Sequence, residues 1–183
     1  FDFINSYTPG VFKRLNLDKL GNKAKNDIYN LTGIDTNDYI FAMNTNAVRH
    51  INNRHGVNGK ADKSMSNTND IARSLYIMQN YDTISTLKDE NGNQVYSREF
   101  KNSDKTPAKM LICTKKINGT YYTALAVPDS TYKKVWLASA YINKKGITQV
   151  PNDELSSLGY TSENELASLP FNKGLDSNAA TVK

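Results

Sequence analysis

The chain has 183 residues, of which 38% are hydrophobic and 22% charged, so it can form one domain with a substantial core. It has no apolar run of the roughly 18 residues that a membrane-spanning helix needs, which excludes such a helix. Its single cysteine, Cys113, excludes an internal disulfide and a multi-cysteine zinc site. Because the first residue is Phe rather than Met, we expect a piece of a longer polypeptide.

The net charge of +5 is unevenly distributed along the chain. From Asn152 onward, five acidic residues stand against two basic ones, a balance of −3, so residues 1–151 carry +8. The positive charge concentrates in residues 49–63, 101–116 and 133–145. A basic body of this kind suits a polyanionic partner such as nucleic acid, and a solvated surface that aids solubility is the alternative.

Helical spacing and capping residues dominate the chain before Tyr81. The pattern predicts helices over residues 9–20, 24–31, 45–55 and 70–80. We expect Gly33 to end the second helix, and Asn44 and Gly56 to cap the third. Thr68 or Asn69 is the expected N-cap of the fourth helix.

After Tyr81 the chain alternates β-branched and aromatic residues with polar ones, which predicts strands over 83–87, 94–100, 109–117, 121–127 and 134–142. The pairs Asn91-Gly92 and Asn118-Gly119 predict type I′ hairpins, whose two central residues need positive φ. We therefore expect an α+β fold with a helical N-terminal half packed on a four- to five-stranded antiparallel β-meander. The expected divisions are a helical segment over 1–43, a core over 44–150 and an acidic, loosely ordered tail over 151–183.

Both histidines of the chain lie in the segment Arg49-His50-Ile51-Asn52-Asn53-Arg54-His55-Gly56. Histidine suits proton transfer because its ordinary pKa lies near neutrality. On a helix, His55 shares the core-facing stripe of Val48 and Ile51, whereas His50 lies about 140° further round the axis. Both can then serve one site only if the helix breaks between them, so we favour His55 for catalysis or phosphate contact. The plainer alternative is a buried histidine that caps carbonyl groups.

The strand predicted over 134–142 alternates along its length. One face pairs the hydroxyl of Ser139 with the ring of Tyr141, a combination that can hydrogen-bond a phosphate and stack a base in single-stranded RNA. The plainer alternative is an exposed sheet surface. The full alternation assigns Trp136, Ala138, Ala140 and Ile142 to the helix-packed face, and Leu137, Ser139 and Tyr141 to the other.

A His-Ile-x-x-Arg-His-Gly helix followed by a meander with Ser-x-Tyr on its last strand resembles the Barnase–EndoU–colicin–RelE (BECR) fold nucleases of phage-associated and polymorphic toxin proteins. The resemblance spans about residues 31–145. It implies a metal-independent endoribonuclease without cofactors, which cuts RNA or tRNA through attack of the 2′-OH and leaves a 2′,3′-cyclic phosphate. It also implies a toxin or effector domain of a larger phage or mobile-element protein, with an immunity protein as partner and the cytoplasm of a target cell as its place of action.

By the same resemblance, His55 matches the motif histidine, Ser139 the strand hydroxyl and Tyr141 the nearby aromatic residue. The sheet half contains no second histidine, so the general acid stays open between Lys115, Arg54 and His50. The resulting catalytic candidates are His55, Ser139, Tyr141 and Lys115; the candidates for phosphate binding are Arg54, His50, Arg49 and Lys109.

Two other functions fit the same residues. A nucleic-acid-binding or protein-interaction module of the same fold would need no catalysis. A metal-dependent nuclease with ligands from residues 50–55 is disfavoured, because no Asp/Glu pair stands nearby. Neither a P-loop nor a GxGxxG or GxSxG motif occurs, which sets aside nucleotide hydrolases, dehydrogenases and serine hydrolases.

Overall fold

The computed structural model describes residues 2–142, 149–150 and 160–162, so most of the expected acidic tail over 151–183 lies outside the described residues. No helix in these ranges is long and apolar enough to cross a membrane. The helices are α1 (Asp2–Asn5), α2 (Asn22–Thr32), α3 (Thr45–His55) and α4 (Thr68–Gln79). The strands are β1 (Arg14–Lys19), β2 (Ile40–Asn44), β3 (Thr83–Thr86), β4 (Lys88–Asp89), β5 (Val95–Lys101), β6 (Pro107–Lys109), β7 (Leu111–Ile117), β8 (Thr120–Asp129), β9 (Lys134–Ile142), β10 (Gln149–Val150) and β11 (Tyr160–Ser162).

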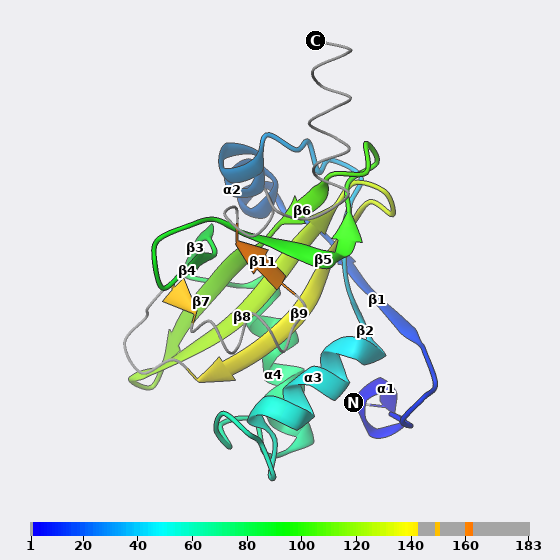
Figure 1. Cartoon of the computed structure of the whole chain (residues 1–183), viewed down its shortest axis with the longest axis vertical. Helices are drawn as coiled ribbons and strands as arrows, with labels where there is room; N and C mark the ends of the chain where they lie inside the picture. Colours follow the sequence, from blue (N-terminus) through cyan, green and yellow to red (C-terminus); the bar gives the residue numbers. More distant parts are fainter. Residues whose placement is uncertain (1, 143–148, 151–159, 163–183) are drawn as a thin grey trace.

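A six-stranded sheet in the order β1-β2-β9-β8-β7-β3 forms the centre of the molecule (Figure 1). β9, β8, β7 and β3 are antiparallel neighbours, whereas β2 runs parallel to β9. The α+β class is therefore confirmed, but the sheet is mixed. It is larger than the expected meander because β1 and β2 come from the N-terminal half of the chain.

The predicted helix over residues 9–20 is wrong, because residues 14–19 form strand β1. Leu15 and Leu17 are half-buried, and the exposed Asn16 and Asp18 alternate with them. This period of two fits a strand, whose successive side chains point to opposite faces. The N-terminal half is accordingly not the helical layer that we expected.

The other three predicted helices are present. Gly33 ends α2 in the left-handed region with φ 75°, and its N–H donates to the carbonyl of Tyr29. Asn44 caps α3 by accepting from the N–H groups of Asn46 and Ala47. α4 begins one or two residues earlier than expected, because Asn67 forms a capping box with Asp70.

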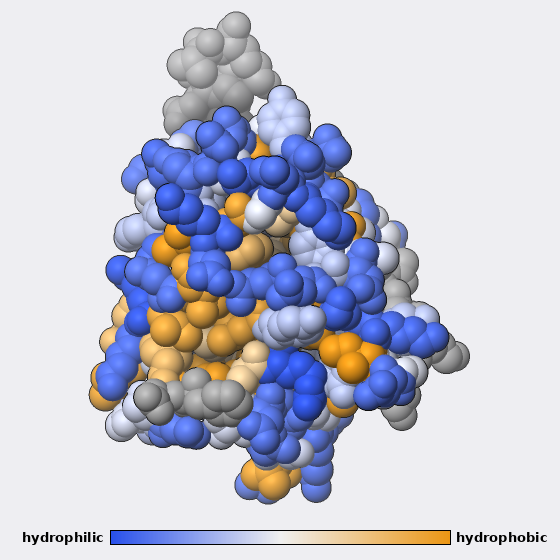
Figure 2. Space-filling model, turned by 180° about the vertical axis from the view of Figure 1, so that it is seen from behind, coloured by the Kyte–Doolittle hydropathy of each residue, from blue (hydrophilic) through white to orange (hydrophobic). Residues whose placement is uncertain are grey.

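Two hydrophobic clusters pack against the sheet. One joins α2, α3 and α4 to the sheet through side chains such as Ile28, Ile51 and Met78. The other lies under β5 and β6, where Phe100 stacks on Trp136 with ring centroids 5.0 Å apart and planes 7° apart. Figure 1 shows β5 in front of the sheet and α4 behind it. The rear face is mostly hydrophilic, with hydrophobic side chains gathered in its middle (Figure 2).

α3 packs against β9, the strand that carries two of the candidate residues. β2 pairs with β9 only as far as Met43, which lies opposite Leu137. The chain then turns at Asn44 into α3. The helix is thereby placed beside the last residues of β9, where no strand from the described part of the chain pairs on that side.

One of the two predicted type I′ turns is present, and the other is not. Asn118 and Gly119 both have positive φ, 50° and 82°, as a type I′ hairpin requires. In the other pair only Gly92 has positive φ, so that turn is not type I′. The carboxylate of Asp89 holds it instead, by accepting from the N–H groups of Asn91 and Asn93.

Because of a β-bulge at Ala138, the predicted assignment of β9 residues to the two faces of the sheet is wrong beyond that residue. Ser139 lies opposite Leu125 and Leu137 opposite Ala126, so Ala138 is an extra residue on β9. An extra residue reverses the alternation beyond it. Trp136 and Tyr141 consequently belong to one hydrophobic cluster, whereas Leu137 and Ala140 belong to the other.

The capping of α3 yields a stability prediction. Asn44 is 2% exposed, and its side-chain NH₂ also donates to Glu99 on β5. We expect Asn44→Ala to lower the free energy of unfolding in urea by about 1–2 kcal/mol, the upper part of the range for a lost N-cap. The matched change Asn67→Ala removes an exposed cap of α4 and should cost less, about 0.5–1 kcal/mol. Equal losses in the two variants would show that Asn44 does no more than cap its helix.

Candidate active site

The segment after α3 folds back over the C-terminal end of that helix. The last four carbonyl groups of a helix have no partner within it, so other donors must reach them. Residues 60–65 supply these donors at distances of 2.8–3.1 Å. The bonds run from the N–H of Lys60 to Asn53 O, from Ala61 and Asp62 to Arg54 O, and from Met65 to His55 O.

Two glycines make this return possible by leaving room. A Cβ on Gly56 would lie 2.5 Å from the carbonyl oxygen of Asn52, and one on Gly59 would collide with the carbonyls of Asp62 and Arg54. Gly56 occupies the C-cap position that we expected, but its φ of −79° is ordinary. Close packing, and not a left-handed turn, therefore requires glycine there.

The returning segment brings Asp62 to His55. The Nδ1 atom of His55 lies 3.0 Å from the Oδ2 atom of Asp62, in an Asp–His pair that the sequence did not reveal. The His55 side chain is 3% exposed, as its place on the core-facing stripe predicted, whereas that of Asp62 is 43% exposed. An Nδ1–H that donates to a carboxylate leaves Nε2 as the nitrogen for proton transfer.

Ser64 ties Asp62 to the end of β9. Its N–H and hydroxyl donate to the Oδ1 atom of Asp62 at 2.9 and 2.6 Å, and its hydroxyl oxygen accepts from the N–H of Ile142 at 3.1 Å. Partial burial acts to raise the pKa of Asp62, but the bonds from Ser64 and the neighbouring His55 outweigh it, so the pKa lies below its ordinary value. The carboxylate therefore stays charged beside the imidazole.

Two aromatic neighbours complete the surroundings of His55. The ring of Tyr141 lies 5.2 Å from it between centroids, with the planes tilted by 30°. The ring of His50 lies 6.0 Å away in an edge contact at 67°. α3 is continuous between the two histidines, so they come together without the helix break that we expected to be necessary.

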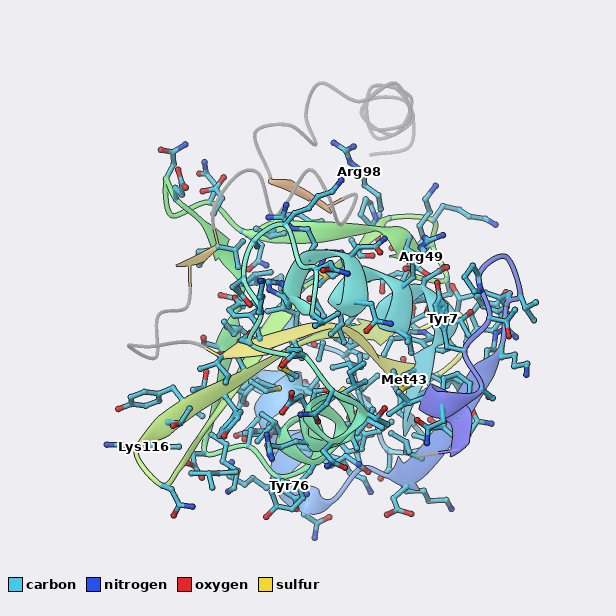
Figure 3. The ribbon with its side chains drawn as sticks, turned by 90° about the horizontal axis from the view of Figure 1, so that it is seen from below. Tyr7, Met43, Arg49, Tyr76, Arg98 and Lys116 are labelled. Carbon is cyan, nitrogen blue, oxygen red and sulfur yellow. The ribbon has the colours of Figure 1, made fainter. Side chains whose placement is uncertain are left out.

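The remaining candidates near this centre differ in exposure. Ser139 shares β9 with Tyr141 but is 0% exposed, and its hydroxyl has no hydrogen-bond partner among the described residues. Arg54 is half-buried on the last turn of α3, and Arg49 is exposed on its first half. Figure 3 places Arg49 and Arg98 on the side of α3 that faces β5.

The structure does not bring the two candidate lysines to His55. Lys115 forms an ion pair with Asp82 at 3.0 Å and lies 5.9 Å from the ring of Tyr76 on α4. Figure 3 shows Tyr76 on the opposite side of the sheet from Arg49. Lys109 on β6 donates to the carbonyl of Leu31 on α2 at 3.4 Å, away from α3. Neither lysine has a place in the arrangement around His55.

Asp62 and Ser64 are the residues of this centre that sequence reasoning missed. Asp62 lies in an irregular, polar segment with no periodicity to place it. One signal was available, because the carbonyls at the end of α3 need donors and the two glycines after His55 permit the chain to turn back. Within the part of the chain that the structure describes, no group of three or more His, Cys, Asp or Glu side chains could hold a metal ion.

Comparison with known proteins gives one match. Residues 18–149 match a family model described as phage-Barnase-EndoU-ColicinE5/D-RelE like nuclease3. No curated protein and no solved structure gives a significant match. The matched range covers more than half of the chain and contains α3, the segment that follows it and β9. The chain therefore belongs to this family of phage-associated, BECR-like nucleases.

Proposed function

We propose that this nuclease domain is a metal-independent endoribonuclease centred on His55. The observation that carries the proposal is the fixed position of the His55 imidazole. Its Nδ1 atom lies 3.0 Å from the Oδ2 atom of Asp62, and its ring lies beside the ring of Tyr141. A carboxylate that accepts from one ring nitrogen fixes the tautomer and favours the imidazolium during proton transfer. This is the same role that the aspartate has in a Ser-His-Asp triad.

The chemistry needs two proton transfers. A base removes the proton of a ribose 2′-OH, and the 2′-oxygen attacks the adjacent phosphorus. The bond from phosphorus to the 5′-oxygen then breaks, and an acid protonates that oxygen to give a 2′,3′-cyclic phosphate and a free 5′-hydroxyl. We assign these steps to His55 and His50, whose rings lie 6.0 Å apart. A positioned acid or base typically contributes about 10²–10⁴-fold to the rate.

The other assignments follow from position. Arg54, beside His55 at the end of α3, and Arg49 are assigned to phosphate groups, which fits the charge of +8 on residues 1–151. Tyr141 positions the reacting nucleotide. Ser139 is fully buried, so we do not assign its hydroxyl to contact with RNA. Lys115 and Lys109 are left out of the site.

The biological setting is part of the same proposal. The matching family is phage-associated, which supports a toxin or effector domain within a larger phage or mobile-element protein. Such a domain would act on RNA, tRNA included, in the cytoplasm of a target cell. An immunity protein that covers α3 and β9 would block it.

One observation favours a second candidate function. Because the His55 side chain is 3% exposed, it could serve only to hold the end of α3, within a nucleic-acid-binding module that cuts nothing. In that case the domain binds RNA in a salt-sensitive way and leaves it intact. RNA would reach His55 in the catalytic case from the side of His50, which is half-buried.

The two functions predict different results for RNA incubated with the purified domain in EDTA. The wild type should cut bulk RNA or tRNA, and His55→Ala and His50→Ala should each be slower by about 10²–10⁴-fold in kcat. Lys115→Ala is the matched control, because it removes a cationic candidate on the opposite side of the sheet, and it should cut at the wild-type rate. Thermal melting of each variant checks the fold. Intact RNA with the wild type, bound but not cut, would support the second function instead.

The Asp62–His55 pair predicts how stability depends on pH. The folded-state pKa of Asp62 lies below its ordinary 3.8, so its ionisation stabilises the fold above that pH. The contribution is lost as the pH falls through the lower, folded-state value. Asp62→Asn should therefore be less stable than the wild type in urea at neutral pH, and the difference should shrink in acid below pH 3.8.

Asp104→Asn is the control for this change. Asp104 accepts from the N–H and hydroxyl of Thr106 in the same local arrangement that joins Asp62 to Ser64, but it has no histidine partner in the described structure. Its substitution should cost less stability at neutral pH. Equal costs would mean that His55 contributes nothing to the ionised state of Asp62.

A further inference from the structure

A pocket of about 120 Å³ opens at the N-terminal end of α3. It lies between the first turn of that helix and the segment that follows α1. Aromatic rings, an amide and a guanidinium line it; the residues that matter here are Tyr7, Val11, Phe12, Asn46 and Arg49. Figure 3 shows Tyr7 and Arg49 side by side at this end of the helix.

Two hydrogen bonds hold the two sides of the pocket together. Lys13 and Thr45 exchange two hydrogen bonds, one from Lys13 N to the hydroxyl oxygen of Thr45 at 3.2 Å and one from Thr45 N to Lys13 O at 3.0 Å. These bonds fasten the segment before β1 to the start of α3. Phe12 is nevertheless 53% exposed, although most of an aromatic ring of this size is usually buried.

Phe12 also belongs to a stack in which the guanidinium of Arg14 lies near two aromatic rings, those of Phe12 and Tyr132. The guanidinium carbon of Arg14 lies 5.2 Å from the centroid of Phe12 and 5.3 Å from that of Tyr132. Tyr132 is 56% exposed. An arginine held between two exposed rings has its donors pre-positioned for an anion, and both rings offer a face for stacking.

Two lysines, Lys133 and Lys134, add positive charge next to Tyr132. Lys133 is paired with Asp38 at 2.8 Å, but the Nζ atom of Lys134 is bonded to the neutral amide of Asn16. Partial burial, and then the positive charge of Arg14, lower the pKa of Lys134, and the opposing effect of the Asp129 carboxylate is smaller. Arg14 and Lys134 therefore repel each other, and an anion bound between them would relieve that repulsion.

Flat rings interleaved with cations fit one class of partner best. Single-stranded nucleic acid presents phosphates to the cations and the face of each base to the rings. We propose that the pocket and the Phe12–Arg14–Tyr132 stack form a base-binding subsite for the single-stranded part of the RNA that flanks the scissile phosphate. The identification of the bound strand as RNA rests on the proposed function, whereas the binding of a single-stranded nucleic acid does not.

α3 connects this subsite to the candidate active site. Arg49 lines the pocket and is followed on the helix by His50, and from Arg49 to His55 the axis rises by about 9 Å at about 1.5 Å per residue. A strand that runs along α3 would meet the pocket at one end and His55 at the other, and it would pass His50 on the way. Arg49 would then contact the phosphate between them.

The test uses a 2′-O-methyl oligonucleotide of about eight nucleotides, which lacks the attacking 2′-OH and so reports binding alone. Fluorescence anisotropy gives the Kd for the wild-type chain, Phe12→Ala and Arg14→Gln. Loss of one base–aromatic contact should weaken binding by roughly 5- to 150-fold. The matched controls are Tyr121→Ala and Lys116→Gln, which break a similar pair 5.3 Å apart on the β7–β8 hairpin, and they should bind as the wild type does.

A second oligonucleotide of the same length, with abasic sugars, isolates the stacking. Phe12→Ala should bind it as tightly as the wild type does, because no base is present to stack. Wild-type affinity of Phe12→Ala for the normal oligonucleotide, or an equal loss in the control variants, would overturn the subsite and favour a protein-docking role for these rings. If His55→Ala cuts RNA normally while Phe12→Ala binds poorly, the active-site assignment fails and the subsite stands.

Discussion

The last carbonyl groups of α3, which need donors from outside the helix, are the constraint on which the rest of the site depends. Backbone N–H groups of residues 60–65 bond to these carbonyls, so the segment 56–65 folds back over the end of the helix. Gly56 and Gly59 leave space for this fold because they have no side chain. Because the return is fixed by backbone bonds, Asp62 is placed beside His55 without any regular element to position it. Ser64 then fastens the same segment to the end of β9, next to Tyr141.

α3 also joins the two ends of the proposed RNA path. Its N-terminal turn is held by Asn44, by the strand pairing of β1 and β2, and by Glu99 on β5, which accepts from Asn44 and Asn46. Its C-terminal turn carries His55, and His50 lies between the two ends of the helix. A single helix thus sets the separation between the cationic, aromatic pocket and His55, the residue proposed for proton transfer. Fixed placement of this kind is what positioning of a substrate requires.

The sequence predicted the parts of this arrangement that depend on local patterns. The caps Asn44 and Gly33, the strand over 134–142 and the core-facing position of His55 follow from capping chemistry and from periods of 3.6 and 2. The bulge at Ala138 could not be read from alternation, because one extra residue leaves the composition of β9 unchanged and reverses its faces. Asp62 was missed because its contact with His55 depends on the way the loop after α3 folds back. The position of Lys115 next to Tyr76 of α4 could not be predicted, because alternation does not say which face of a sheet a helix covers.

The central claim is that the domain cuts RNA through the ribose 2′-oxygen, with His55 in the proton transfer. The most direct measurement is the mass of the fragments formed from one defined RNA oligonucleotide, beside a copy with a single 2′-deoxyribose at the cleaved position. Cleavage through the 2′-oxygen yields fragments that end in a 2′,3′-cyclic phosphate and begin with a 5′-hydroxyl, with no cutting at the deoxyribose. Fragments that begin with a 5′-phosphate, or cleavage of the deoxyribose copy, would contradict it.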